Sequence, residues 1–244
     1  MVSTDEFVRG YSEAVAAGNA AVFAGAGLSH RAGFVDWKGL LRPFAKDIGL
    51  DVNKESDLGA VAQYYVNKHG SRFQFNQRIL NAFTSQTAMT ENLRILTRLP
   101  ISTYWTTNYD SLLEEGLKAN NRKADKKVSQ GSLSSNIEDR DAVVYKMHGD
   151  VQDPENTVLI KDNYETYAND HALFRTVLQG DLVSKTFLFI GFSFEDPNLE
   201  YVLAQIRVLL GNSVRDHYCF FEKTRKQKKG IRSGFPISLC AAKP

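Results

Sequence analysis

Apolar residues along the chain follow two kinds of spacing. Five short segments predict strands: Ala20–Ala24, Ser102–Thr106, Ala142–Met147, Thr186–Ile190 and His217–Phe221. The first is a continuous apolar run, which is typical of a strand buried on both faces of a parallel sheet. Between the strands, apolar residues recur every three or four positions, which predicts helices. Strands that alternate with helices favour an α/β fold with a Rossmann-like, mostly parallel sheet and helices on both of its faces.

The helical spacing is densest between the first two strands. Predicted helices are Asp5–Ala17, Trp37–Ile48, Leu58–Lys68, Phe73–Phe83, Glu91–Arg98, Tyr109–Lys118, His171–Val183 and Asn198–Leu209. Four of them follow one another without an intervening strand, which indicates a helical insertion at about residues 40–99. Its aromatic residues Tyr64, Tyr65, Phe73 and Phe75 are expected to be core rather than interface.

Two polar stretches interrupt these patterns. Residues 120–138 are rich in Lys, Ser and Asn and are expected to form a surface segment. Residues 1–222 are expected to form one domain, and residues 223–244 a basic, irregular C-terminal tail. Its basic run, Lys223–Lys229, is typical of a solvated linker or helix end. No aromatic residues are interleaved with these charges, which disfavours a nucleic-acid tail.

Composition narrows the class of protein. The 244 residues are 43% hydrophobic and 24% charged, enough for one substantial core, and the net charge of +2 gives no argument for nucleic acid or membrane partners. Cys219 and Cys240 form no CxxC pair, so no cysteine-based zinc site or disulfide framework is expected. The N-terminus lacks the apolar run of a signal peptide, and no stretch is long enough to span a bilayer. We therefore expect a cytoplasmic protein.

Two glycine-containing segments follow predicted strands. Gly25–Ser29 places small residues where backbone N–H groups can hold a phosphate, but from this segment alone a plain tight turn is an equal explanation. His30 replaces the third glycine of a dinucleotide fingerprint, which argues against ordinary dinucleotide binding. In the second segment, Gly191 and Ser193 could line a phosphate or ribose pocket, and Pro197 suits the first turn of a helix. A routine strand–helix connection is the alternative there.

Two further segments carry polar side chains at strand ends. Asn108 could project its amide to position a water or a ribose hydroxyl, although Thr107 or Asn108 could instead simply cap the next helix. His148 could accept a proton from a ribose hydroxyl near neutral pH, and Gly149 beside it lets a ligand come close. A lone histidine is more often structural. All four segments lie where strands are expected to end, so they are expected to share one site.

Together these segments resemble the Sir2 family. The matching residues are Gly25–Ser29 with Gly33, Asp36 and Trp37 (GAGxS…GxPDF), Thr107–Asp110 (TQNxD), His148–Gly149 (the catalytic HG) and Gly191–Ser193 (GxS). The resemblance runs in order from about residue 7 to residue 221. Two departures stand out. Val35 replaces the usual proline before Asp36, and the zinc-binding cysteine pairs of deacylating members are missing, which argues against deacylation.

Several stretches look like the N-terminal Sir2-like domain of Thoeris anti-phage effectors, which are NAD hydrolases. They are Ala24–Ser29, Arg98–Asp110, Asp141–Val151, Leu159–Tyr164 and Gly180–Leu199. This likeness implies a bacterial defence protein that depletes NAD and forms a homo-oligomer. It also implies control by a regulatory domain or partner that responds to a cyclic ADP-ribose-type signal. Those effectors continue into a second domain, so we expect this chain to be a free-standing version, a truncated form, or one whose last ~15 residues are not family sequence.

The resemblance also implies roles for the residues. NAD is the substrate, no metal is needed, and the products are nicotinamide and ADP-ribose or a cyclised form. Asn108 orients the water and His148 acts as base. Gly25, Ala26, Gly27 and Ser29 hold the pyrophosphate, Gly191 and Ser193 lie on the adenosine side, and Asp110 and Asp36 lie near the nicotinamide or its ribose. The alternatives are a zinc-free protein deacylase or ADP-ribosyltransferase, and a catalytically silent module that senses NAD or ADP-ribose.

Overall fold

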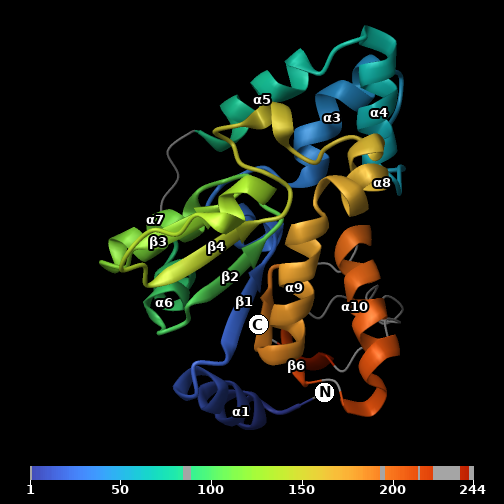
Figure 1. Cartoon of the computed structure of the whole chain (residues 1–244). Coiled ribbons are helices and arrows are strands. Elements are labelled where there is room, and N and C mark those ends of the chain that lie inside the picture. The colour runs from blue at the N-terminus through green and yellow to red at the C-terminus, as the bar shows by residue number, and fades with distance from the viewer. Residues whose placement is uncertain (1, 85–88, 193–195, 214, 222–236, 242–244) are drawn as a thin grey trace.

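The chain folds around a seven-stranded parallel sheet. The computed structural model describes residues 2–84, 89–192, 196–213, 215–221 and 237–241 (Figure 1). The strands are β1 (Ala20–Ala24), β2 (Thr103–Thr106), β3 (Ala124–Lys127), β4 (Ala142–Lys146), β5 (Thr186–Ile190), β6 (His217–Phe221) and β7 (Ile237–Ala241). Their order in the sheet is β3-β4-β2-β1-β5-β6-β7, and all neighbours pair in parallel. The Rossmann-like α/β prediction is therefore confirmed.

Helices connect the strands. They are α1 (Thr4–Ala16), α2 (Ala26–His30), α3 (Trp37–Asp47), α4 (Leu58–His69), α5 (Phe73–Phe83), α6 (Glu91–Arg98), α7 (Leu112–Ala119), α8 (Lys161–Asp170), α9 (Ala172–Ser184) and α10 (Pro197–Leu210). Short 3-10 turns are η1 (Gln130–Ser134), η2 (Pro154–Asn156) and η3 (Gly211–Ser213). Within the described ranges, every helix is too short or too polar to cross a membrane.

The two faces of the sheet are covered by different helices, as Figure 1 shows. Val22 of β1 points into a core shared with α1, α6 and α7, whereas Phe23 points into a core shared with α8, α9 and α10. Both residues are fully buried. A central strand that is covered on both faces needs apolar residues at every position, which explains the continuous run Ala20–Ala24.

A separate helical lobe lies beyond the carboxyl ends of the strands (Figure 1). Its core joins α3, α4 and α5 and includes Phe44, Tyr65 and Phe75. The buried positions of Tyr65 and Phe75 confirm the expectation of a core role, but Tyr64 and Phe73 are 59% and 63% exposed. The predicted insertion was also too long at its end, because α6 packs against the sheet with α7 rather than in the lobe.

The short helix α2 and the 3-10 turns were not predicted from the sequence, and neither were three longer or pairing elements, β3, α8 and β7. Strand β3 lies in the segment predicted to be surface, because its inward side chains, Asp125 and Lys127, are charged and pair with each other at 2.9 Å. This pair leaves no apolar alternation to detect. Helix α8 was not predicted. It buries only Tyr167, so its sequence needs no regular apolar spacing that could reveal a helix. Strand β7 lies in the predicted irregular tail, where pairing with β6 supplies order that the local pattern does not show.

The strand order locates a ligand crevice. From β1 the chain moves to β2 on one side and later returns to β5 on the other side. At such a switch point, the connections after the two strands diverge and leave a crevice at their carboxyl ends. Ligand binding is therefore expected beyond Ala24 and Ile190, beneath the helical lobe.

Candidate functional site

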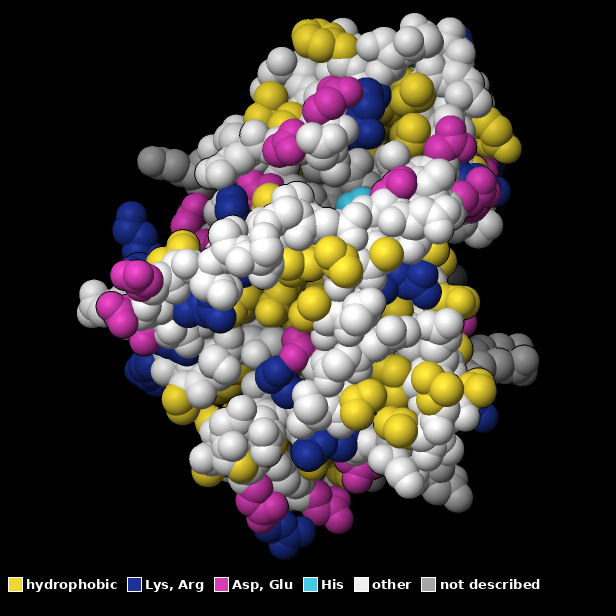
Figure 2. All heavy atoms as spheres, in the orientation of Figure 1, with side chains coloured by type: hydrophobic (Ala, Val, Ile, Leu, Met, Phe, Trp, Pro, Cys, Tyr) yellow, Lys and Arg dark blue, Asp and Glu magenta, His cyan; other side chains and the backbone are white. Residues whose placement is uncertain are grey.

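A cavity of about 1830 Å³ lies at this switch point, between the sheet and the helical lobe. Typical small-molecule pockets have volumes of about 300–1,000 Å³, so the space is sufficient for a dinucleotide. Figure 2 shows the hollow below the lobe, with a histidine side chain inside it. Of the predicted site residues, those that line the cavity are Ala26, Gly27, Ser29, Asp36, Asn108, Asp110, His148 and Gly191. Gly25 is not one of the lining residues, and Ser193 lies outside the described residues.

Glycines bring the loops after β1 and β5 into direct contact. The Gly25 N–H donates to the Ile190 carbonyl at 2.9 Å, and the Gly27 N–H donates to the Gly191 carbonyl at 2.8 Å. A Cβ at Gly25 would lie 2.8 Å from Phe192 Cα, and one at Gly27 would lie 2.9 Å from Gly191 Cα. Small residues are thus required for packing. Because both N–H groups already bind carbonyls, the predicted pyrophosphate contact of this loop stays a prediction.

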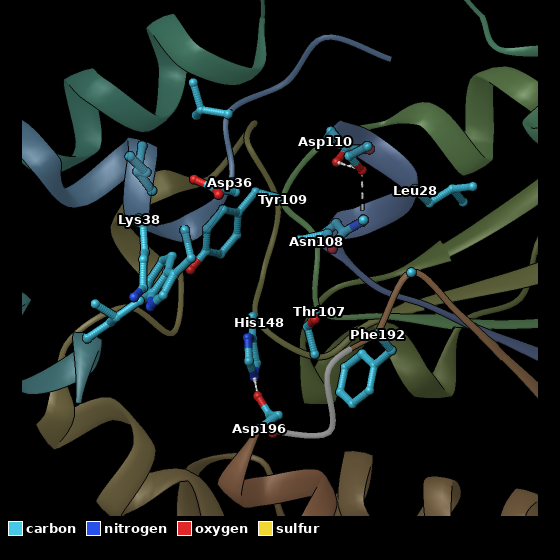
Figure 3. A pocket seen from close by; sticks show the side chains of 18 of the residues that line it. Leu28, Asp36, Lys38, Thr107, Asn108, Tyr109, Asp110, His148, Phe192 and Asp196 are labelled. Atoms are coloured by element: carbon cyan, nitrogen blue, oxygen red, sulfur yellow. Dashed lines mark hydrogen bonds and ion pairs between the residues drawn. The ribbon is translucent and has the colours of Figure 1, made fainter. Parts of the chain in front are cut away.

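The Asn108 side chain is held in one orientation at the end of β2. Its Nδ2 donates to the Gly25 carbonyl at 3.1 Å and to Ser29 Oγ at 2.8 Å. A carbonyl can only accept, so the amide nitrogen must face Gly25 and the Oδ1 must face the other way. Among the described residues Oδ1 has no hydrogen-bond partner, and it lines the cavity as an unused acceptor (Figure 3). A water or a hydroxyl group can donate to it.

Asp110 and Ser29 complete a chain of hydrogen bonds behind this amide. Ser29 Oγ donates to Asp110 Oδ2 at 2.6 Å, and Asp110 Oδ1 accepts from the Leu112 N–H at 3.1 Å. Both side chains are buried. Their polar atoms are thus committed to holding Asn108 and the start of α7. Because Asp110 is bonded to Leu112, the helix begins there and not at Tyr109 as predicted, and neither Thr107 nor Asn108 caps it.

Asp36 occupies a different position in the cavity wall. Its carboxylate accepts from the Gly39 N–H at 2.6 Å and caps α3. The side chain is exposed to solvent and lies on the lobe side of the cavity, near Lys38 and Tyr109 (Figure 3). The structure therefore brings Asp36 to the cavity but separates it from the Asn108 hydrogen-bond chain.

A fully buried lysine supports the same loop from below. Lys146 Nζ donates to the carbonyls of Tyr109, at 2.9 Å, and Asp110, and it pairs with Asp150 at 2.8 Å. Burial raises the pKa of Asp150, but Lys146 and further hydrogen bonds outweigh burial and lower this pKa below its usual value. Burial also raises the pKa of the neighbouring Glu114 carboxyl. Lys146 was not among the predicted site residues, although a lysine in an apolar strand was a visible signal.

His148 leaves the end of β4 and lies across the cavity from Asn108 (Figure 3). Gly149 has a φ of +89°, and a Cβ there would lie 3.1 Å from Thr157 Cα, so glycine permits the tight turn. The imidazole packs against two tyrosine rings of α8, with centroid distances of 5.4 Å to Tyr164 and 6.2 Å to Tyr167. The imidazole is buried, at 5% exposure, so its contacts with these neighbouring side chains limit its orientation.

The Nε2 of His148 lies 2.9 Å from Oδ2 of Asp196 (Figure 3). The other carboxylate oxygen of Asp196 accepts from the N–H groups of Asn198 and Leu199 and caps α10. Burial raises the pKa of Asp196, but the imidazole and these two amides outweigh burial and lower it below its usual range. Pro197 occupies the first turn, as predicted. Asp196 itself was missed, since a helix cap was sufficient to explain it.

Comparison with known proteins places this arrangement in a family. The SIR2-like domain family matches residues 102–235, which is more than half of the chain. The chain belongs to the SIR2-like domain family. The match includes Asn108, His148 and Asp196, which lie in the segments that follow β2, β4 and β5 of this SIR2-like domain.

Individual relatives of this SIR2-like domain are longer proteins. It is 50% identical over 230 residues to a protein of Bacillus cereus (strain MSX-D12) named NAD(+) hydrolase ThsA, covering 94% of this chain and 48% of that protein. A protein of the same name from Cytobacillus dafuensis is 49% identical over 229 residues, covering 93% and 46%. Defense-associated sirtuin 2 of Bacillus subtilis is 26% identical over 230 residues, covering 90% and 22%. The chain thus spans about half the length of the ThsA proteins.

In the parts of the chain that the structure describes, histidine, cysteine and carboxylate side chains form no group of three or more that could hold a metal ion. Cys219 is buried in the core below α9 and α10, away from the cavity.

Proposed function

We propose that this SIR2-like domain hydrolyses NAD at the bond between nicotinamide and ribose, releasing nicotinamide and ADP-ribose. The observation that carries the proposal is the pairing of an oriented amide, Asn108, with a buried imidazole, His148, in one dinucleotide-sized cavity. The relatives named NAD(+) hydrolase, at about 50% identity over most of the chain, support the same substrate.

The chemistry needs little from the protein except positioning. Nicotinamide in NAD is already a cationic leaving group, so the C–N bond breaks with its electron pair passing to the ring nitrogen. Water then bonds to the anomeric carbon and loses a proton. Asn108 Oδ1 would accept a hydrogen bond from that water and orient it without adding charge. His148 would accept the proton from the water or a ribose hydroxyl and pass it to solvent.

The same proposal assigns binding roles to the remaining residues. The pyrophosphate would lie against Ala26 and Gly27, and the adenosine would lie against Gly191 and Ser193. Ser193 is outside the described residues. Asp36 would approach the nicotinamide ribose from the lobe side. Asp110 and Ser29 would act through Asn108, because their polar atoms are already bonded in that chain.

We also propose a biological setting. The domain would act on the cytoplasmic NAD pool during bacterial anti-phage defence, as the names of the relatives suggest for those proteins. A constitutive NAD hydrolase would harm its own cell. Control would therefore come from homo-oligomer assembly, or from a regulatory domain or partner that responds to a cyclic ADP-ribose-type signal.

The test is incubation of the purified chain with NAD alone, at several protein concentrations, followed by chromatography of the products. Nicotinamide and ADP-ribose are expected in equal amounts. If assembly activates the domain, the rate of nicotinamide release should rise more than in proportion to the protein concentration. Release that requires an acylated peptide or an acceptor protein would identify a deacylase or an ADP-ribosyltransferase instead. Thermal stabilisation by NAD without product at any concentration would identify a sensing module.

A further inference from the structure

We infer that Asp196 is a positioning residue that fixes the tautomer of His148, directing the Nε2 proton to its own carboxylate and leaving Nδ1 to face the cavity. The inference rests on the proposed function for its catalytic consequence, but its structural part stands on the contact between Nε2 and Oδ2. The contact is an ion pair of 2.9 Å whose angle is not that of a hydrogen bond, so the carboxylate attracts the Nε2 proton electrostatically, and both side chains are less than 10% exposed.

The carboxylate is itself held in place from the opposite side. Oδ1 of Asp196 accepts from the N–H groups of Asn198 at 3.0 Å and Leu199 at 2.9 Å, so it is anchored to the first turn of α10. This helix is buried against the sheet through Leu199 and Val202. A rigid helix therefore presents one oxygen of Asp196 to the imidazole. An outer partner of this kind selects which histidine nitrogen carries the proton.

The rest of the environment leaves the other ring nitrogen available. Tyr164 and Tyr167 contact the ring in edge-to-face arrangements, and the Tyr167 hydroxyl is already used, since it donates to the Met147 carbonyl. Nδ1 of His148 has no hydrogen bond to any residue that the structure describes. With the proton on Nε2, the Nδ1 lone pair can accept a proton from a substrate hydroxyl or from water.

The charged groups near this pair belong to several elements. Asp196 is the acid that contacts the imidazole, and the His171 imidazole of the α8–α9 junction stacks on Tyr167 nearby. The cavity wall also contains Lys161 and Glu165 of α8. Among these groups only Asp196 lies within ion-pair distance of His148, so a single carboxylate acts on the ring proton at close range.

The decisive variant is Asp196→Asn. Asparagine caps helices about as well as aspartate, so α10 should keep its N-terminal hydrogen bonds. The new amide donates to Nε2 and so places the ring proton on Nδ1, where the histidine can no longer accept from the substrate. We expect kcat to fall by about 10²–10⁴, the range for losing a general base, with little change in KM.

A matched control separates this effect from general destabilisation. Asp181 on α9 is also a buried carboxylate; it accepts from Trp105 Nε1 at 2.8 Å, pairs with Lys185, and lies away from the cavity. Asp181→Asn should lower the unfolding free energy without changing kcat. Equal losses of kcat in the two variants would overturn the assignment.

The tautomer can be read without any enzymatic assay. Nitrogen NMR of protein labelled at its five histidines, with His148 assigned by its loss in His148→Ala, reports which ring nitrogen is protonated. We expect the Nε2–H form in the parent chain and the Nδ1–H form in Asp196→Asn. The same form in both proteins would refute the positioning role. Absence of NAD hydrolysis in the parent chain, with the expected tautomer change, would refute only the proposed function.

Discussion

The two sides of the cavity are built in opposite ways. On the Asn108 side, neutral and charged groups form a hydrogen-bond chain that ends at the first residue of α7, and every partner lies in the segments that directly follow β1 and β2. On the His148 side, a single ion pair joins the end of β4 to the start of α10, across the sheet. The orientation of the Asn108 amide is therefore held by more than one hydrogen bond, whereas the His148 imidazole has one ion-pair partner.

This difference indicates how each side should respond to mutation. Removing one member of the Asn108 chain leaves the amide bonded to the Gly25 carbonyl, so part of its orientation survives. Removing Asp196 leaves the imidazole packed against two tyrosine rings but without the carboxylate that attracts its proton. The imidazole side should therefore be the more sensitive of the two to changes outside the catalytic residue itself.

The largest expected effect comes from deleting the two central side chains. Asn108→Ala and His148→Ala should each lower kcat for nicotinamide release by about 10²–10⁴ while the protein stays folded. Both groups act on one transition state, so the double variant should lose much less than the product of the single losses. Steady-state kinetics and circular dichroism of all three variants check this. Near-full turnover in either single variant would remove that side from the mechanism.

The next largest effect concerns Lys146, the buried lysine that binds the loop after Asn108. Lys146→Met removes the buried cation that binds the Tyr109 and Asp110 carbonyls, and it should lower the unfolding free energy by about 3–5 kcal/mol and also reduce kcat. Lys127→Met is the matched control, since Lys127 is buried and paired with Asp125 on the edge strand β3. It should destabilise the protein without reducing kcat, as measured by urea denaturation and activity assays. If both variants reduced kcat equally, Lys146 would have no specific link to the site.

A smaller effect tests the redundancy of the Asn108 chain. Ser29→Ala removes its central hydroxyl and leaves a buried Asp110 oxygen unsatisfied, at a cost of about 1–3 kcal/mol. Because Gly25 still holds the amide, kcat should fall by only about 10- to 100-fold. Ser184→Ala, which removes an exposed hydroxyl on α9, is the control and should change neither quantity. A loss in Ser29→Ala as large as that in Asn108→Ala would contradict the redundancy.

The smallest effect is the pH dependence of stability on the His148 side. The pKa of Asp196 is lowered by folding, so the stability it contributes is complete above its unfolded pKa of about 3.9 and is lost as the pH falls through the lower folded value. Asp196→Asn should therefore be less stable than the parent chain by a constant amount between pH 5 and about pH 7. The difference should shrink below about pH 4. Denaturant titrations at several pH values measure it, and a difference that grows in acid would contradict the sign.

The strands β1, β2, β4, β5 and β6, and the positions of Asn108 and His148 at strand ends, were predictable from local pattern. Both faces of β1 are buried, so its apolar run was visible in the sequence, and both polar residues follow a run of this kind. The edge strand β3 was not predictable, because its inward residues are a paired aspartate and lysine. The same limit applied to α8, which buries a single aromatic ring.

The sequence by itself determined the chemistry that is present: small residues after β1 and β5, an amide after β2 and an imidazole after β4. Only the tertiary structure decided what each group binds. Ser29 and Asp110 hold the amide, and Asp196, forty-eight positions after His148, meets the imidazole. The physical reason is that partners in a parallel sheet come from strands distant in the chain, so their pairing depends on strand order and not on local spacing.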